Sequence, residues 1–504
     1  MRDNRILLLA LFMAGAVVAC AQSGPPVVYV TATPARIASI EPSLPNPFLP
    51  TWTPSGPTAT PIQPTPNPTY PPLQLLATYT IENGDTLATI AQAYGTSVDQ
   101  LLGLNSGLSA SSTIFVGQVI NVPSRPTQTT PNVKLIPDSE LVNSPGARGF
   151  DIFAYIKFQP GFIRVYSEEV PTLPGEAPRV MSGAEIIQFV ATSASVNPRL
   201  LLALLEYRGH WITNPAPDPD SIAYPMGNKD PQQKGLFKQV NWAANTLNAG
   251  YYGWKYRGMA ALKFSDNSRL AFAPELNPGS VAVQYFLSQS VDRATWQNQV
   301  QLSGFLTTYM AMFGDPFRLA YEPLIPPDLH QPTFQLPFKQ GETWYFTAGP
   351  HGGWDNNSGW SAIDFAPPRP PDSVVTAQGS CYISANDATA VIGGLITRSG
   401  DGQIVIDINM DGDERVGWTV VYLHVAAQDS IKAGTVVQAG QAIGHPSCEG
   451  FYLNALATHL HVARRYNGEW LPADCWACAP GVADPPYVIG GWTVKGYPAQ
   501  VYQG

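Results

Sequence analysis

Four histidines and one aspartate in the last third of the chain have the types and spacing of a metal site. They are His351, Asp364, His424, His459 and His461. The last two stand in Thr-His-Leu-His-Val, an apolar run that predicts a β-strand, so both rings should point to one face. One of them can bind a metal, and its neighbour is left for acid–base work. Two further His or Asp ligands would complete an open zinc site with a water in the fourth position. This is the chemistry of a hydrolase.

The motifs around these residues resemble those of the lysostaphin-type zinc peptidoglycan endopeptidases, peptidase family M23. The similarity covers residues 331–504, about the last third of the chain. It rests on three motifs in order, with a glycine-rich stretch at 431–444 between the last two: Asp364-Phe-Ala-Pro-Pro, Tyr422-Leu-His424 and His459-Leu-His461. Three ordered motifs are a far more specific signal than one His-x-His. The resemblance implies an antiparallel β-sheet domain that holds one catalytic Zn²⁺.

The resemblance also implies a role for each of the five residues. His351, Asp364 and His461 become the zinc ligands, and His424 and His459 become the catalytic histidines. The implied chemistry is sound, because zinc lowers the pKa of a bound water to about 7. Two free imidazoles can then accept its proton, stabilise the oxyanion and protonate the leaving amine.

The spacing of the first two ligands is unusual. Most of the family has its first ligand four residues before the aspartate, where this chain has Trp360, whereas here the offset is 364 − 351 = 13. That offset resembles the branch of staphylolysin and the β-lytic endopeptidases. Asp355, four residues after His351, is the alternative ligand. We favour Asp364, because its strand-like surroundings and Pro-rich turn match the family; the stretch that begins at Asp355 is then expected to be a surface loop.

The first 20 residues predict an exported lipoprotein. A charged start is followed by an apolar run, Ile6–Ala19, which is too short to span a bilayer. Val-Val-Ala-Cys20 resembles a bacterial lipobox, which implies cleavage before Cys20, its lipidation and a membrane anchor on the extracytoplasmic side of the cell envelope. Residues 21–76 are rich in Pro and Thr and predict an extended linker without a core.

Residues 77–124 resemble a LysM domain, with the order strand, helix, helix, strand. LysM modules bind glycans that contain N-acetylglucosamine, so peptidoglycan is the implied partner. Sugar contacts are expected from the loop Gly84-Asp85-Thr86 and from the segment before Asn105. Asp85 or Thr86 could equally serve as a helix N-cap, so binding and folding roles both stay open.

After a linker at 125–137, residues 138–330 predict a helical domain similar to the lysozyme-like fold of lytic transglycosylases. Arg208 stands where that family has its acid glutamate, and it cannot donate a proton at neutral pH. Glu206 lies about 200° away round the helix. We therefore expect a glycan-binding or spacing domain rather than a glycosidase. Three aromatic residues could stack on sugars or pack in the core: Tyr251, Tyr252 and Trp254.

Two further patterns concern metals and disulfides. Asp407, Asn409 and Asp411 occupy positions 1, 3 and 5 of a calcium loop, although position 12 is Trp418 rather than glutamate. Ca²⁺ is therefore a secondary candidate there. The chain has 5 cysteines, and the four other than Cys20 predict two disulfides with three possible connectivities. We favour pairing Cys381 with Cys448 and Cys475 with Cys478.

Charge argues against one class of partner. A net charge of −9, with 13% charged residues, provides no electrostatic case for nucleic acid. The expected fold class is multidomain α+β: a small LysM βααβ module, a helical lysozyme-like domain and a C-terminal antiparallel zinc peptidase domain. The expected function is hydrolysis of amide bonds in peptidoglycan peptides by a membrane-tethered zinc endopeptidase. The alternative is a non-catalytic peptidoglycan-binding adaptor or activator of another cell-wall hydrolase.

Overall fold

The computed structural model describes residues 28–31, 76–94, 96–109, 112–123, 129–170, 178–266, 268–370, 380–451, 455–475, 478, 482 and 485–496. The predicted signal peptide, the predicted lipid attachment site at Cys20 and most of the Pro/Thr-rich segment fall outside these residues. Within the described part, every helix is either too short or too polar to cross a membrane.

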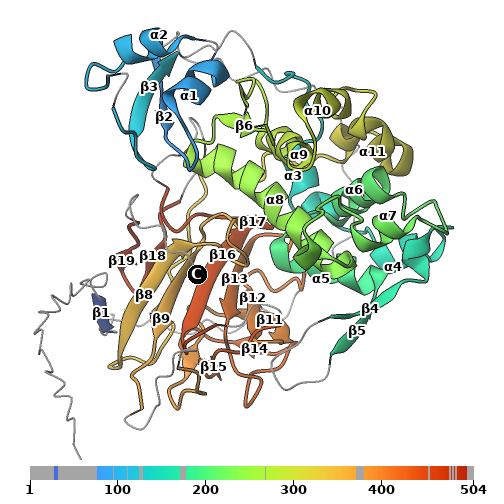
Figure 1. The fold of residues 1–504 in the computed structure, drawn as a ribbon. Coiled ribbons are helices and arrows are strands. Elements are labelled where there is room, and N and C mark those ends of the chain that lie inside the picture. Colours follow the sequence, from blue (N-terminus) through green and yellow to red (C-terminus); the bar gives the residue numbers. More distant parts are fainter. Residues whose placement is uncertain are drawn as a thin grey trace, which may run out of the picture.

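The N-terminal module has the predicted strand, helix, helix, strand order (Figure 1). Its elements are β2 (Leu76–Thr80), α1 (Leu87–Ala93), α2 (Val98–Gly103) and β3 (Val119–Pro123). The two strands pair antiparallel. Each helix begins with a reciprocal capping box, Thr86 with Thr89 and Ser97 with Gln100. Asn105 then joins α2 to β3, because its amide bonds the carbonyls of residues 101 and 121 and the N–H of residue 121. Thr86 and Asn105 are therefore fold determinants.

Asp85 is also a structural residue. It binds Arg269, which is 2% exposed and belongs to a hairpin of the next domain. The guanidinium lies 2.6 Å from Asp85 Oδ1 and donates to Tyr79 Oη at 3.2 Å and Glu82 Oε2 at 3.3 Å. A carboxylate that is fully buried in this way is unavailable to a sugar. It fixes the module against the helical domain instead.

We expect Arg269→Met to lower the free energy of unfolding by about 3 kcal/mol, because it leaves the buried Asp85 carboxylate without its cation. Calorimetry measures the total loss, and hydrogen exchange in β2 and β3 shows whether it falls on the LysM module. Arg164→Met, at an exposed position, is the matched control. Adding Asp85→Asn should recover part of the loss, and the absence of any recovery would contradict a direct pair.

Residues 138–319 are mainly helical. The elements are α3 (Asp138–Leu141), η1 (Pro145–Ala147), α4 (Ile152–Lys157), η2 (Phe162–Arg164), β4 (Ser167–Val170), β5 (Arg179–Ser182), α5 (Gly183–Ala194), α6 (Pro198–Gly209), α7 (Pro219–Ala223), η3 (Pro231–Gln233), α8 (Leu236–Arg257), β6 (Ala261–Lys263), β7 (Arg269–Ala271), α9 (Pro278–Ser288), α10 (Arg293–Gln299), α11 (Phe305–Phe313) and η4 (Pro316–Leu319). The long helix α8 packs against α5 and α9. Helix α6 begins at Pro198 after the Asn197 cap, and residues 200–205 are wholly buried, so it runs through the core.

The C-terminal region is built on an antiparallel sheet with the order β1-β8-β9-β16-β13-β12-β11-β14, with β17 paired to β16. Its strands are β1 (Val28–Thr31), β8 (Thr343–His351), β9 (Ala362–Ala366), β11 (Gly394–Gly400), β12 (Gln403–Asp407), β13 (Trp418–Leu423), β14 (Val436–Val437), β16 (Leu460–Tyr466) and β17 (Glu469–Trp470). Two small ribbons flank it: β10 (Ala388–Thr389) with β15 (Ala442–Gly444), and β18 (Val488–Ile489) with β19 (Trp492–Thr493).

The two faces of this sheet pack differently. Alternate residues such as Ile363 and Val462 lie in a core within the β domain. The residues between them, such as Ala362 and Ala463, join the hydrophobic core of the helical domain. Figure 1 shows α8 and α5 beside β16, β17 and β13. The helical domain therefore covers part of the sheet face that also carries Asp364 and His461.

Polar groups complete this interface. Buried Glu469 of β17 accepts hydrogen bonds from Tyr251 at 3.2 Å and Tyr256 at 2.8 Å, and it forms an ion pair with Lys255. The backbone N–H of Trp470 donates to Tyr252 Oη at 3.0 Å. Tyr251 and Tyr252 are 0% exposed. They are therefore interface residues, and the possibility that they stack on sugars is wrong.

Candidate active site

Four neighbouring strands bring the five predicted site residues together. His351 ends β8, Asp364 lies in β9, and His461 lies in β16. His424 follows the last residue of β13, and His459 precedes the first of β16. Because β9, β16 and β13 are adjacent, Asp364 lies directly opposite His461, and His461 lies opposite Leu423.

A register shift puts His351 on the correct face. Ala348 lies opposite Asp364, so a regular ladder would place Pro350 opposite Ala362. The shift between Ala348 and His351 adds one residue, and His351 pairs with Ala362 instead. Since opposite residues share a face, the bulge turns His351 towards Asp364. Motif spacing alone does not contain this irregularity.

The three predicted ligands converge. One ligand atom from each of His351, Asp364 and His461 lies within 4.8 Å of the others, and no other group of this kind occurs among the described residues. His351 Nε2 is 2.9 Å from Asp364 Oδ2, and His461 Nδ1 is 3.3 Å from Asp364 Oδ1. The side chains of Asp364 and His461 are only 10% and 5% exposed, so most of the cluster is shielded from water.

The other ring nitrogen of each ligand histidine is held by the backbone. His351 Nδ1 is 3.2 Å from the Gly352 carbonyl, and His461 Nε2 is 3.1 Å from the Gly353 carbonyl. A carbonyl only accepts, so with a cation bound these nitrogens would carry the proton, and the lone pairs of His351 Nε2 and His461 Nδ1 would face the ion beside Asp364. Glycine is required at 353, because a Cβ there would lie 2.3 Å from Ser361 Oγ.

These residues fit a divalent metal. His351 Nε2 and Asp364 Oδ1 are buried, and although each lies close to a facing ligand atom, neither makes a hydrogen bond of regular geometry within the described part of the chain. Orphaned buried polar atoms are costly unless something binds them. A cation at the point where they converge would satisfy both. Two imidazoles and one carboxylate form a donor set that zinc accepts while keeping a position open.

Asp355, the alternative ligand, has another use. Its Oδ1 accepts hydrogen bonds from the N–H of Asn357 at 3.0 Å and from Ser358 Oγ at 2.6 Å. The expected surface loop is only partly at the surface: Asn356 is exposed, whereas Ser358 and Gly359 are buried. Asn357 donates to Asn245 Oδ1 of α8 at 2.7 Å. The helical domain covers this loop, and Asp355 shapes it.

Separate substitutions test the ligand choice. We expect Asp364→Asn to weaken zinc binding by about 100-fold or more, because the neutral amide removes the negative donor. Asp355→Asn should keep one zinc per chain. Competition with a chromophoric chelator measures both affinities. Zinc loss in Asp355→Asn alone would make Asp355 the ligand.

His424 and His459 lie beside the three ligands. Their ring centroids are 4.6 Å apart, and His424 is 6.2 Å from His461. His424 Nδ1 is 3.0 Å from the Glu449 carbonyl, and His459 Nδ1 is 2.8 Å from the Ala457 carbonyl, so the lone pair of each ring is on Nε2; that of His459 lies 3.5 Å from Asp364 Oδ2. Burial, with the neighbouring His459 and His461, lowers the pKa of His424 to about 3. A neutral His424 is the form that can accept a proton.

The calcium possibility at 407–411 finds no support. Asp407 is 0% exposed, and its Oδ2 accepts the N–H of Gly412 at 2.8 Å. Asp411 accepts the N–H of Asp413 at 2.9 Å and lies 3.7 Å from Arg148. These carboxylates fold the β12–β13 hairpin and join it to the helical domain. Asp407 and Asp411 belong to no metal-binding group in the described residues.

The helical domain contains no free acid at the position expected for a glycosidase. Glu206 accepts hydrogen bonds from the N–H groups of Ile212 at 2.8 Å and Thr213 at 3.2 Å. Arg208 donates to the Leu287 carbonyl at 3.2 Å, and burial lowers the pKa of its guanidinium. Both side chains are therefore used by the fold.

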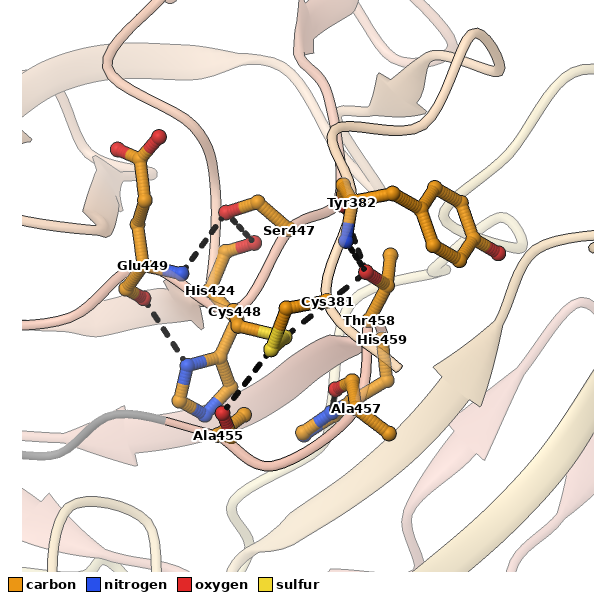
Figure 2. The surroundings of a disulfide bond; sticks show 10 residues. All are labelled: Cys381, Tyr382, His424, Ser447, Cys448, Glu449, Ala455, Ala457, Thr458 and His459. Atoms are coloured by element: carbon orange, nitrogen blue, oxygen red, sulfur yellow. Dashed lines mark hydrogen bonds between the residues drawn. A yellow bond between two sulfur atoms is a disulfide. The ribbon is translucent and has the colours of Figure 1, made fainter. Parts of the chain in front are cut away.

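Both favoured disulfides are present. Cys381 pairs with Cys448 across 67 residues, and Cys475 pairs with Cys478. Figure 2 shows the first of them close to His424 and His459. The sequence did not indicate this proximity, nor did it identify the carbonyl groups that orient the histidines. The Gly-Gly pair after His351 was the available signal for two of those carbonyls.

Family comparisons assign the first two domains. The LysM domain model matches residues 79–123, and the model described as LasA, N-terminal domain, matches residues 134–327. A curated relative, the secreted LysM effector ELP2 of Colletotrichum higginsianum, is 47% identical over 47 residues. That match covers 9% of this chain and 26% of the effector, so the chain spans about a quarter of that relative's length.

Solved structures of low identity resemble part of the chain. Pseudoalterin, a novel M23 metalloprotease from the deep sea, is 24% identical with a TM-score of 0.21, over 28% of this chain and 75% of its own. The catalytic domain of the prophage-encoded M23 protein EnpA from Enterococcus faecalis is 20% identical (TM-score 0.19; 29% and 96% covered). Lysostaphin from Staphylococcus simulans is 19% identical, with a TM-score of 0.18, over 28% of this chain and 51% of its own. The chain combines a LysM domain, a LasA N-terminal domain and a large antiparallel sheet, which is the composition of a cell-wall peptidase or a related protein.

Proposed function

We propose that the protein is a zinc-dependent endopeptidase that hydrolyses amide bonds in the peptide part of peptidoglycan. The observation that carries the proposal is the convergence of the ligand atoms of His351, Asp364 and His461 within 4.8 Å, with two further imidazoles beside them. The LysM domain supports the proposal that the binding partner is a glycan that contains N-acetylglucosamine. It also favours a location outside the cell or in the wall.

Zinc bound at this site would polarise the scissile carbonyl and lower the pKa of a water molecule. His424, held neutral by burial, presents Nε2 as a base for the proton of the attacking water. His459, whose side chain is 19% exposed, lies on the more open side, where its Nε2 can take up a proton and pass it to the leaving amine. The carbonyls of Glu449 and Ala457 keep both rings in the tautomer this requires.

Substrate would approach from the side of His351 and His459. Their side chains are 25% and 19% exposed, against 10% for Asp364 and 5% for His461. Trp354 and Phe451 line the neighbouring loops, and both contact Phe189 of α5, at ring distances of 5.9 Å and 4.9 Å. The helical domain therefore packs against the loops beside the site.

Membrane attachment is a separate part of the proposal. It rests on the lipobox-like sequence before Cys20, which falls outside the described residues. Mass spectrometry of the N-terminal peptide from the native host tests it. A diacylglyceryl cysteine supports anchoring, and an unmodified residue at that position contradicts it.

Product chemistry tests the proposed reaction. Purified protein is incubated with purified peptidoglycan, after chelation and again after zinc is restored. New free amines that depend on zinc support the endopeptidase. New reducing ends would indicate a glycosidase instead. Wall binding without either product, in zinc-loaded protein, would favour the adaptor.

A further inference from the structure

The Cys381–Cys448 disulfide lies between the two segments that hold the non-ligand histidines (Figure 2). The Cα atoms of the two cysteines are 5.6 Å apart. Cys381 is exposed and Cys448 is partly buried, so the bond can be reached from solvent. Each cysteine stands between residues that contact one histidine or its immediate neighbour.

Cys448 belongs to the segment that orients His424. On one side of it, Ser447 donates to the His424 carbonyl through its N–H at 2.6 Å and through Oγ at 3.1 Å. On the other side, the Glu449 carbonyl is 3.0 Å from His424 Nδ1. The N–H of His459 also donates to the Ser447 carbonyl, at 3.3 Å. The residues on both sides of Cys448 therefore fix the backbone and the ring of His424.

Cys381 belongs to the segment that holds the approach to His459. The N–H of Tyr382 donates to Thr458 Oγ1 at 2.8 Å, and this hydroxyl donates to the Tyr382 carbonyl at 2.6 Å. The N–H of Thr458 donates to the Ser380 carbonyl at 3.0 Å. Thr458 immediately precedes His459, so the two neighbours of Cys381 fix the point at which the His459 segment enters β16.

The metal ligands depend on other contacts. His351, Asp364 and His461 belong to the paired strands β8, β9 and β16, and the outer nitrogens of the two histidines are held by Gly352 and Gly353. The disulfide joins none of these residues. Its position therefore divides the site into a sheet-borne metal half and a loop-borne acid–base half.

We infer that the Cys381–Cys448 disulfide is a positioning element that holds His424 and His459 in register with the metal ligands, and that reducing it disengages these two histidines while zinc stays bound. The inference rests on the proposed function. A trialkylphosphine can carry out the reduction: it supplies two electrons and becomes the phosphine oxide, while one water provides that oxygen and the two protons of the new thiols. Because this disulfide is accessible and lies beside the catalytic histidines, activity would depend on an oxidising environment.

The test compares two double variants of the full chain. In Cys381→Ser/Cys448→Ser we expect one zinc per chain to remain, kcat on a soluble peptidoglycan peptide to fall about 100-fold, and KM to change far less. The control is Cys475→Ser/Cys478→Ser, because that disulfide packs against the main chain of Tyr256 at the helical domain. We expect the control to keep kcat. Equal kcat in both double variants and the wild type would overturn the inference.

A second readout does not depend on catalysis. Long-range ¹H–¹⁵N NMR of the zinc-loaded wild type should show the Nδ1–H tautomer for His424 and His459. After phosphine reduction, both signals should change and then recover on reoxidation, while His351 and His461 stay unchanged. Unchanged His424 and His459 signals would refute the positioning role even if the wild type proved inactive. The NMR result therefore tests the positioning role separately from the proposed peptidase activity.

Discussion

His461→Ala protein is expected to contain no bound zinc and to lose at least about 1,000-fold of its peptidase turnover. The metal supplies several kcal/mol of transition-state stabilisation, and each 1.36 kcal/mol is a factor of ten in rate. His461 is 4% exposed and presents Nδ1 3.3 Å from Asp364 Oδ1, so alanine leaves a gap that neighbouring side chains do not fill. Metal analysis after gel filtration, with the rate of amine release from peptidoglycan, measures both losses.

The control for this experiment is His330→Ala, at an exposed position before β8. It should keep its zinc and its rate. Circular dichroism establishes that the His461→Ala fold persists. A folded His461→Ala protein that retains one zinc per chain would show that zinc binds at a site that does not include His461.

His424→Asn and His459→Ala are expected to keep zinc but to lower kcat by about 10²–10⁴-fold. Neither ring belongs to the ligand group, and both present Nε2 towards the site. Asparagine is the better replacement at 424, because this residue has a φ of +64°, a left-handed conformation that asparagine tolerates more readily than alanine. Steady-state kinetics on a soluble peptide, with zinc measured in the same samples, gives the result.

Two comparisons sharpen that prediction. His445→Ala is the matched control, because this histidine follows β15 and lies 3.2 Å from the Asn386 carbonyl, outside the five-residue cluster. It should keep kcat. If the two rings act on one proton path, the fold-reduction of kcat in the double variant of His424 and His459 should be much smaller than the product of the two single fold-reductions. Zinc loss in His424→Asn would instead make His424 a ligand.

The LysM module could be predicted from short stretches of sequence. The helix starts at Thr86 and Ser97 are set by side chains three residues away, so a short window of sequence contains their cause. The role of Asp85 was different. Its partner, Arg269, lies 184 positions later in the chain (269 − 85), and only the docked hairpin shows that the carboxylate serves the domain interface.

The helical domain also combines features that nearby residues set with features that distant residues set. The start of α6 at Pro198 follows from proline geometry and the Asn197 cap. The use of Tyr252 does not, because its hydroxyl meets the backbone of Trp470, 218 residues away. An aromatic residue on a helix looks the same in the sequence whether it faces a sugar, solvent or a second domain.

The sequence by itself determined which chemical groups the site contains and that His459 and His461 share a face, because side-chain direction along a strand has a period of two residues. It also favoured Asp364 over Asp355. Only the tertiary structure decided where the other groups lie: the extra residue in β8 that turns His351 inward, the carbonyls that orient each imidazole, and the helical domain that covers the loop at 355–359. The physical reason is range. Alternation and capping act over a few residues, whereas register, burial and hydrogen-bond partners are set by strands and helices that are distant in the chain.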